Sequence, residues 1–227
     1  MTAALSDVLA EARSIGFLGP GPLDVQIRHA EGFAAVARRL LERDLDSVPA
    51  TPDPRGRPPG SPALVLDLGS GGGLPGLVVA QSWPEARVVL LEAQGRRAAF
   101  LGRAVEALGL GDRVAVRQAR AEEFGRDPAG RSRFDVVTAR SFGPPAVVAE
   151  CAAPLLRTGG WLVVSEPPDQ SDEEVTQRWP AGPLAQLGLR PGERLRAAFD
   201  YRALGQAEPC PERFPRRNGV PAKRPLF

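Results

Sequence analysis

Hydrophobic residues recur along the chain in two patterns, and one gives way to the other near residue 63. Before it, apolar residues return at helical spacing, which predicts helices over 3–18 and 24–45. After it, short runs rich in Val and Leu alternate with helical stretches. These runs predict five strands, over 64–68, 87–92, 113–118, 134–139 and 160–165. Beyond residue 190, RLRAAFDYRALG predicts one or two further strands near the edge of the sheet.

Strands that are apolar throughout and joined by helical crossovers are typical of a parallel sheet covered on both faces. We therefore expect an open, Rossmann-like α/β domain over 63–227, with its ligand at the carboxyl ends of the strands. Residues 46–62, DSVPATPDPRGRPPGSP, contain too much Pro and Gly for a packed element and predict a flexible linker. An N-terminal helical extension, 1–45, precedes that linker.

The composition is that of a globular protein, since 43% of its 227 residues are hydrophobic and 25% are charged. A net charge of +2 neither requires nor excludes nucleic acid. Cys151 and Cys210, the only cysteines, lack metal-ligand spacing, so no metal site is predicted. No apolar run is long enough to span a membrane and the N-terminus has no secretory pattern, so we expect a cytoplasmic protein.

The stretch GSGGGLPG, residues 69–76, follows the first predicted strand and admits three interpretations. Gly71, Gly73 and Gly76 fit G-x-G-x-x-G, in which a helix N-terminus receives the pyrophosphate of a dinucleotide. Asp67, followed by glycines at every second position, fits a loop that holds S-adenosylmethionine. The third interpretation is a tight turn that needs glycine for its backbone conformation and binds nothing.

Acidic residues after three successive strands favour the second interpretation. Asp67 would repel a pyrophosphate but attract the ammonium and sulfonium groups of S-adenosylmethionine; its alternative role is a helix N-cap or a turn. Glu92, at the end of the second strand, is suited to accept hydrogen bonds from both ribose hydroxyls. Ala121 and Glu122 follow the third strand, where backbone and a carboxylate can meet an adenine amino group. Acids at that place are also typical of a solvated helix start.

With these residues the sequence resembles the bacterial 16S ribosomal RNA guanine-N7 methyltransferases, the RsmG or GidB family, from about residue 63 to the C-terminus. DLGSGGG is generic, whereas its continuation LPG is more specific. LLEAQGRRAAFL stands where the family reads L-L-D-S-x-x-K-R-x-x-F-L, and FDVVTARSF is similar to the family's fourth strand and the arginine after it. PERFPRRNGVPAKRPL resembles the basic ending of many members.

The resemblance implies a class I methyltransferase fold with a mostly parallel seven-stranded sheet and S-adenosylmethionine as cofactor. It implies small-subunit ribosomal RNA, or the small ribosomal subunit, as the partner, and we expect a monomer. The expected cofactor-binding residues fall into four groups. The methionine side is assigned Asp67, Gly69, Ser70, Gly71 and Leu74, and the ribose is assigned Glu92. The adenine is assigned Ala121 and Glu122, and the mouth of the active site is assigned Arg140.

Guanine N7 carries an in-plane lone pair, so its methylation needs alignment with the sulfonium methyl group and no general base. Arg140 is the expected catalytic residue, because an arginine can orient guanine through O6 or hold the adjacent phosphate. A structural salt bridge at the strand end is the alternative for this residue.

Basic residues gather in two places that we expect to contact RNA. Arg96 and Arg97 open a helix near the cofactor loop. The C-terminus holds the densest group, which comprises Arg213, Arg216, Arg217, Lys223 and Arg224. This composition fits binding to a phosphate backbone, and a solvated tail is its alternative.

Two other functions stay open on the sequence. The family's N-terminal R-H-x-x-D-S segment appears only in part, as RHAEG at 28–32, and SEPP at 165–168 stands in place of its Lys-Gly pair. A methyltransferase on the same scaffold that acts on a small molecule would fit these departures. A non-catalytic RNA-binding protein that keeps the fold is the other alternative.

Overall fold

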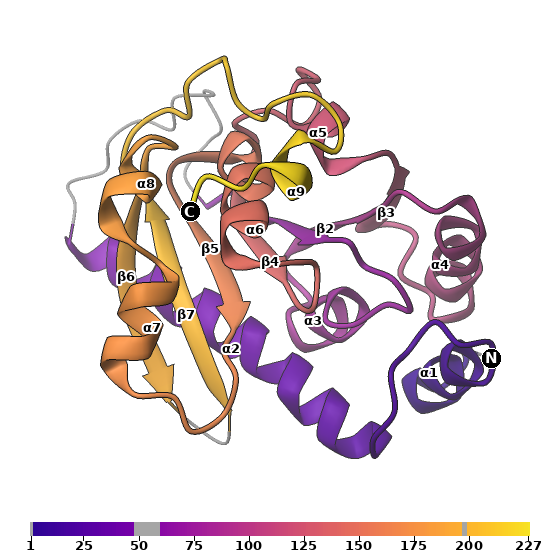
Figure 1. Cartoon of the computed structure of the whole chain (residues 1–227). Helices are drawn as coiled ribbons and strands as arrows, with labels where there is room; N and C mark the ends of the chain where they lie inside the picture. The colour runs from indigo at the N-terminus through magenta and orange to yellow at the C-terminus, as the bar shows by residue number, and fades with distance from the viewer. Residues whose placement is uncertain (1, 48–59, 197–198) are drawn as a thin grey trace.

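The computed structural model describes residues 2–47, 60–196 and 199–227. Its strands are β1 Leu64–Leu68, β2 Arg87–Glu92, β3 Val114–Gln118, β4 Phe134–Ala139, β5 Leu156–Ser165, β6 Leu189–Arg196 and β7 Asp200–Gln206. They form one seven-stranded sheet in the order β3-β2-β1-β4-β5-β7-β6 (Figure 1). β1 to β5 are parallel to one another, whereas β7 pairs antiparallel with β5 and with β6. The mostly parallel, seven-stranded α/β sheet expected from the sequence is confirmed.

Five strands lie where the pattern predicts them, and three of these have the predicted bounds. β3 begins one residue late, and β5 begins at Leu156, four residues early. The reason for the early start is the pair Gly159 and Gly160, which the strand absorbs as an irregularity with a register shift against β4. Gly159 has a φ of 77°, which favours glycine. The stretch beyond residue 190, which predicts one or two strands near the sheet edge, contributes to two strands, β6 and β7. β7 lies inside the sheet and β6 lies at its edge.

The helices are α1 Leu5–Ser14, α2 Leu23–Ser47, α3 Gly76–Ser82, α4 Gly95–Ala107, α5 Ala121–Phe124, α6 Pro145–Ala152, α7 Asp172–Arg178, α8 Ala181–Ala185 and α9 Val220–Lys223, with a 3₁₀ turn at Ala153–Leu155. α1 is shorter than predicted because Gly16, with a φ of 75°, ends it. α2 runs through Ser47, so it includes the start of the predicted linker; residues 48–59 of that linker lie outside the described residues. In the described part of the chain no helix is long and apolar enough to cross a membrane.

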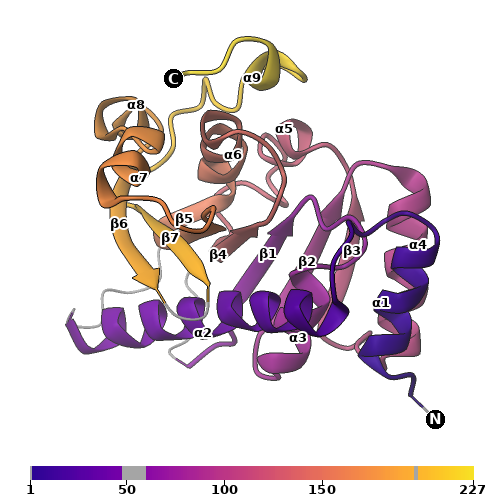
Figure 2. The ribbon, with the colours of Figure 1, turned by 60° about the horizontal axis from the view of Figure 1, so that its bottom comes forward.

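Helices cover both faces of the sheet (Figure 2). On one face, α1 to α4 pack through a core that includes Phe33, Leu101 and Trp161. On the other, α5 to α8 and the C-terminal segment (residues 207–227) pack through a core that includes Val148 and Phe214. The carboxyl ends of the parallel strands therefore meet along one edge of a sheet that is covered on both sides.

The C-terminal segment is docked on α5 and α6. Arg216 pairs through two nitrogens with Glu150 of α6, at 2.8 Å from Nε to Oε1, and the Glu150 side chain is fully buried. The N–H of Gly219 donates to Glu122 of α5 at 2.9 Å. A solvated tail, the alternative interpretation of this segment, is not what the structure shows.

Candidate active site

A pocket of about 200 Å³ lies at the carboxyl ends of four neighbouring strands. The segments that follow β1, β2, β3 and β4 each contribute to its wall, as expected for an open α/β sheet. Its lining residues are Gly69, Leu91, Glu92, Ala93, Arg97, Ala119, Ala121, Ser141 and Phe142. Four of the residues proposed from the sequence are therefore brought together here, namely Gly69, Glu92, Arg97 and Ala121.

Glu92 joins two loops at the floor of this pocket. Its Oε2 accepts the N–H of Gly71 in the glycine loop at 2.9 Å, and its Oε1 accepts the N–H of Gln94 at 2.8 Å. The residue is 6% exposed, and each carboxylate oxygen keeps a further lone pair for another donor. Glu92 thus shapes the loop and presents an acceptor to the pocket.

Asp67 lies beneath the glycine loop and does not line the pocket. The residue is fully buried, its Oδ2 accepts the N–H of Gly76 at 3.0 Å, and its Oδ1 accepts the hydroxyl of Thr138 at 3.1 Å. Burial raises the pKa of Asp67 to about 6, although these hydrogen bonds oppose the shift. Asp67 therefore binds the first N–H of α3, as a capping side chain does, although the N-cap residue itself is Pro75. A dinucleotide pyrophosphate would meet this carboxylate at the helix N-terminus.

The glycines of the loop serve different purposes. Gly69 has a φ of 73°, and a methyl group on it would lie 2.5 Å from the Phe142 ring. A methyl group on Gly72 would lie 2.7 Å from Leu18, and one on Gly76 would lie 2.3 Å from Leu90. All three glycines are therefore required by packing within the protein, and Gly69 also by its φ. Because Gly69 lines the pocket, it also leaves that part of the wall free of a side chain.

Three further residues of the proposed site have contacts away from the pocket. Ser70 donates its hydroxyl to the carbonyl oxygen of Asp67 at 3.1 Å. Leu74 is buried in the apolar cluster between α2 and α3. The Glu122 carboxylate accepts from Arg120 at 3.2 Å and from the Gly219 N–H. Their contact with a cofactor stays a prediction.

Arg140 follows β4 and turns toward α2. Its Nη2 lies 3.4 Å from Oε1 of Gln26, and its Nη1 is buried without a hydrogen-bond partner among the described residues. Burial lowers the pKa of Arg140. Burial, together with the Arg140 charge, also lowers the pKa of His29 to about 4. Within the described chain Arg140 makes no ion pair, so the salt-bridge alternative is wrong.

The remaining basic residues differ in exposure. Arg97 lines the pocket and lies over the Phe17 ring at 5.6 Å, whereas Arg96 is exposed at the start of α4. In the C-terminal segment four cations are exposed: Arg213, Arg217, Lys223 and Arg224. Arg216 differs because it is held by Glu150.

Phe142 and Ser141 are site residues that the sequence interpretation missed. Both follow Arg140 within FDVVTARSF, in the loop after β4. The signal available in the sequence is an aromatic residue three positions after the end of a strand whose carboxyl end faces the ligand. Phe142 covers Gly69 and closes one side of the pocket.

Residues 40–179 match the family model GidB, described as rRNA small subunit methyltransferase G. The chain belongs to this family. The match begins within α2, before residue 63, and it ends before the basic C-terminal segment, so that segment is not part of the matched region.

Relatives in the GidB family share about two fifths of their residues with this chain. "Ribosomal RNA small subunit methyltransferase G" of Prochlorococcus marinus (strain MIT 9313) is 40% identical over 169 residues, 73% of this chain and 68% of the relative. The protein of the same name from Roseiflexus castenholzii is 39% identical over 74% of this chain and 72% of the relative. An O-methyltransferase from Bacillus cereus, solved in complex with SAH, has a TM-score of 0.58 at 16% identity over 88% of this chain and 90% of that chain. The structural likeness supports the fold.

Asp67→Asn should remove a pH dependence of stability. The Asp67 pKa rises from 3.8 to about 6 on folding, so its stabilising effect is complete below about pH 4 and lost as the pH rises through about 6. Relative to the variant, the free energy of unfolding of the wild type should fall by about 2 kcal/mol between pH 4 and pH 7. Urea denaturation at several pH values measures this difference. A difference that does not vary with pH would contradict the buried, titrating carboxylate.

Proposed function

We propose that this chain transfers the methyl group of S-adenosylmethionine to N7 of a guanine in small-subunit ribosomal RNA. Membership of the GidB family carries the proposal, because the relatives are named as small-subunit ribosomal RNA methyltransferases. A pocket at the carboxyl ends of β1 to β4 supports it, since ligands of open α/β sheets bind there.

The pocket residues fit the cofactor. Glu92 offers carboxylate oxygens for the ribose hydroxyls, and Leu91, Ala119 and Ala121 offer a small apolar surface for the adenine. Gly69 lacks a side chain where the methionine part would pass. The buried Asp67 acts through its charge beneath the loop rather than by contact, because it is fully buried and does not line the pocket.

When bound, the cofactor supplies an electrophilic methyl group on a positively charged sulfur. Guanine N7 supplies the electron pair, so the protein's task is to hold the two groups in line and to exclude water. Arg140 is the residue proposed to orient the base, since its Nη1 is free of protein partners in the described residues and an arginine can donate to guanine O6. Its long contact with Gln26 would have to open or adapt.

The RNA surface is proposed to include Arg96, Arg97 and the exposed cations of the C-terminal segment. Arg216 supports that surface by fixing the segment on Glu150. We further propose that the protein acts as a monomer in the cytoplasm. A division into an N-terminal helical extension, a linker and a catalytic domain (63–227) belongs to the same proposal, with the start of the linker moved past Ser47, where α2 ends.

A labelled methyl-transfer assay tests the substrate. With S-adenosylmethionine labelled in its methyl group, we expect label in the ribosomal RNA of unmethylated small subunits, at guanine N7. Each of a panel of small metabolites should accept at least a hundredfold less. Transfer to a metabolite but not to subunits would establish the small-molecule alternative, and cofactor binding without any transfer would argue for a non-catalytic protein.

Glu92→Gln should weaken cofactor binding by roughly ten- to a hundredfold. The change removes a charge-assisted acceptor, which is worth about 1.5–3 kcal/mol. Isothermal calorimetry with S-adenosylmethionine measures the dissociation constant, and Glu85→Gln, an exposed acid before β2, is the matched control. Equal affinity in wild type and Glu92→Gln would place the cofactor elsewhere.

Neutralising two exposed cations, Arg217→Gln with Lys223→Gln, should weaken the salt dependence of RNA binding. Each phosphate contact of a single strand contributes about 0.7 to the log–log slope, so the slope should flatten by about 1.4. Titrations of RNA at several salt concentrations measure it, with cofactor affinity unchanged.

The matched control for that pair is Arg38→Gln with Arg87→Gln, which removes the same charge from exposed residues outside the C-terminal segment. Arg216 is left intact because its loss would release the segment from Glu150. If the two double variants show the same slope as the wild type, the segment does not contact RNA.

A further inference from the structure

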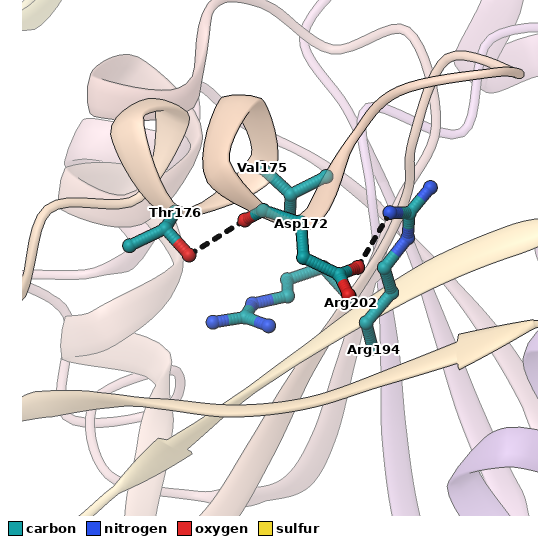
Figure 3. Close-up of a pocket in the computed structure, with 5 residues that line it drawn as sticks. All are labelled: Asp172, Val175, Thr176, Arg194 and Arg202. Atoms are coloured by element: carbon teal, nitrogen blue, oxygen red, sulfur yellow. Dashed lines mark hydrogen bonds and ion pairs between the residues drawn. The ribbon is translucent and has the colours of Figure 1, made fainter.

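A second pocket, of about 300 Å³, lies between α7 and the paired strands β6 and β7 (Figure 3). Its lining residues are Asp172, Val175, Thr176, Arg194 and Arg202. None of them lines the pocket proposed for the cofactor, and none is among the site residues expected from the sequence. The two arginines determine which kind of ligand this pocket could bind.

Arg194 and Arg202 are partners in the antiparallel β6–β7 ladder, so their side chains leave the same face of the sheet. Like charges placed directly opposite each other in a sheet destabilise it. Arg194 is compensated, because it pairs with Asp172 at 2.8 Å and with Asp200 at 3.1 Å. Figure 3 shows its guanidinium turned to the Asp172 carboxylate.

Arg202 is not compensated in this way. No hydrogen bond or ion pair joins it to another described residue, and its Nε is buried without a partner. Glu166 and Asp172 attract it from a distance. The Glu166 carboxylate is already bound by Arg178 at 3.0 Å and by Trp179, and the Asp172 carboxylate is bound by Arg194 at 2.8 Å. Burial lowers the pKa of Arg202 and the neighbouring Arg194 charge adds to the shift, while Glu166 and Asp172 oppose it.

A capping box satisfies two of the N–H groups at the start of α7. Ser171 and Glu174 form a capping box, in which the Glu174 N–H donates to the Ser171 hydroxyl and the Ser171 N–H donates to the Glu174 carboxylate. Among the lining residues of the pocket the cationic donors are the two arginines, so a ligand would be recognised by them.

We propose that this pocket binds a phosphate group, with Arg202 as the main contact and Arg194 as the second. A planar guanidinium with several donors matches the oxygens of a phosphate and would give Arg202 the anionic partner it lacks. We assign the phosphate to the backbone of the RNA substrate, which rests on the proposed function.

The position in the sheet favours an RNA phosphate. Arg202 lies opposite Val164, next to the carboxyl end of β5, and so on the same edge of the sheet as the cofactor pocket. Three strand steps separate β1 from β7, which is about 14 Å at 4.8 Å a step. A polymer that presents one nucleotide at the cofactor pocket can extend along this edge and place a neighbouring phosphate at Arg202.

One lining group opposes an anion. The Asp172 side chain is 82% exposed at the pocket and would repel a phosphate. The proposal can therefore be tested in two directions. Removal of the Arg202 charge should weaken phosphate binding, and removal of the Asp172 charge should strengthen it. Glu173, an exposed acid in the same helical turn that does not line the pocket, gives the matched control.

The experiment compares wild type, Arg202→Gln, Asp172→Asn and Glu173→Gln by the dissociation constant for small ribosomal subunits, the dissociation constant for S-adenosylmethionine and inhibition by inorganic phosphate. Arg202→Gln should weaken subunit binding about five- to tenfold, and Asp172→Asn should strengthen it about threefold. Glu173→Gln should change it less than twofold, and cofactor affinity should stay the same in all four. Arg202→Lys, which keeps the charge, should recover part of the lost subunit affinity. That recovery would show that the effect of Arg202→Gln is not a folding defect.

The outcomes separate this proposal from the proposed function. Subunit binding that is unchanged in Arg202→Gln, together with phosphate inhibition that is unchanged, would overturn the site. Phosphate inhibition that depends on Arg202 while subunit binding does not would overturn the assignment to RNA and indicate a free phosphate ligand. If the wild type transfers no methyl group to subunits but Arg202-dependent phosphate binding persists, the function fails and the phosphate site stands.

Discussion

Carboxylates that bind backbone N–H groups hold the loops of this active site in place. Glu92 ties the glycine loop to the turn after β2 through Gly71 and Gln94, and Asp67 ties the end of β1 to the start of α3 through Gly76. Both acids are almost completely buried, and the Glu92 charge adds to the rise in the pKa of Asp67. The loop therefore keeps its shape through charged groups whose burial is unfavourable unless they are hydrogen-bonded. Pocket geometry and folding stability depend on the same two residues.

The C-terminal segment follows the same principle on the other face of the sheet. Its anchors are a fully buried Glu150 that binds Arg216, and a Glu122 that binds the Gly219 N–H beside the pocket residue Ala121. Arg126 and Arg131 of the domain also donate to carbonyl oxygens of the segment. Of the segment's own basic residues, Arg216 is therefore used in docking. The remainder faces solvent at a defined position. A rigid array of cations loses less entropy on meeting a phosphate backbone than a mobile tail would.

The strands were predictable because a parallel sheet covered on both faces requires continuous apolar runs, and β4, buried over its whole length, is the clearest example. Features that depend on tertiary contacts could not be predicted from the sequence. Arg216 and Arg217 are adjacent and chemically identical, yet one pairs with a buried glutamate and the other is exposed. Asp67 was correctly placed at the end of β1, but no local pattern shows that both of its oxygens are taken by Gly76 and Thr138. The pairing of Arg194 with Arg202 likewise needs the β6–β7 register, which the sequence does not provide.

The surroundings of Arg140 agree with a methyl transfer that needs no base. His29 is the one histidine of the chain, and burial lowers its pKa to about 4, so it is neutral at physiological pH and a weak proton acceptor. Arg140 keeps its charge in the same half-buried region, with Gln26 as its only hydrogen-bond partner among the described residues. A neutral imidazole does not compete with guanine for the guanidinium as a carboxylate would. The site is therefore suited to orienting an acceptor that already carries its own lone pair, and poorly suited to removing a proton from a hydroxyl or an amine.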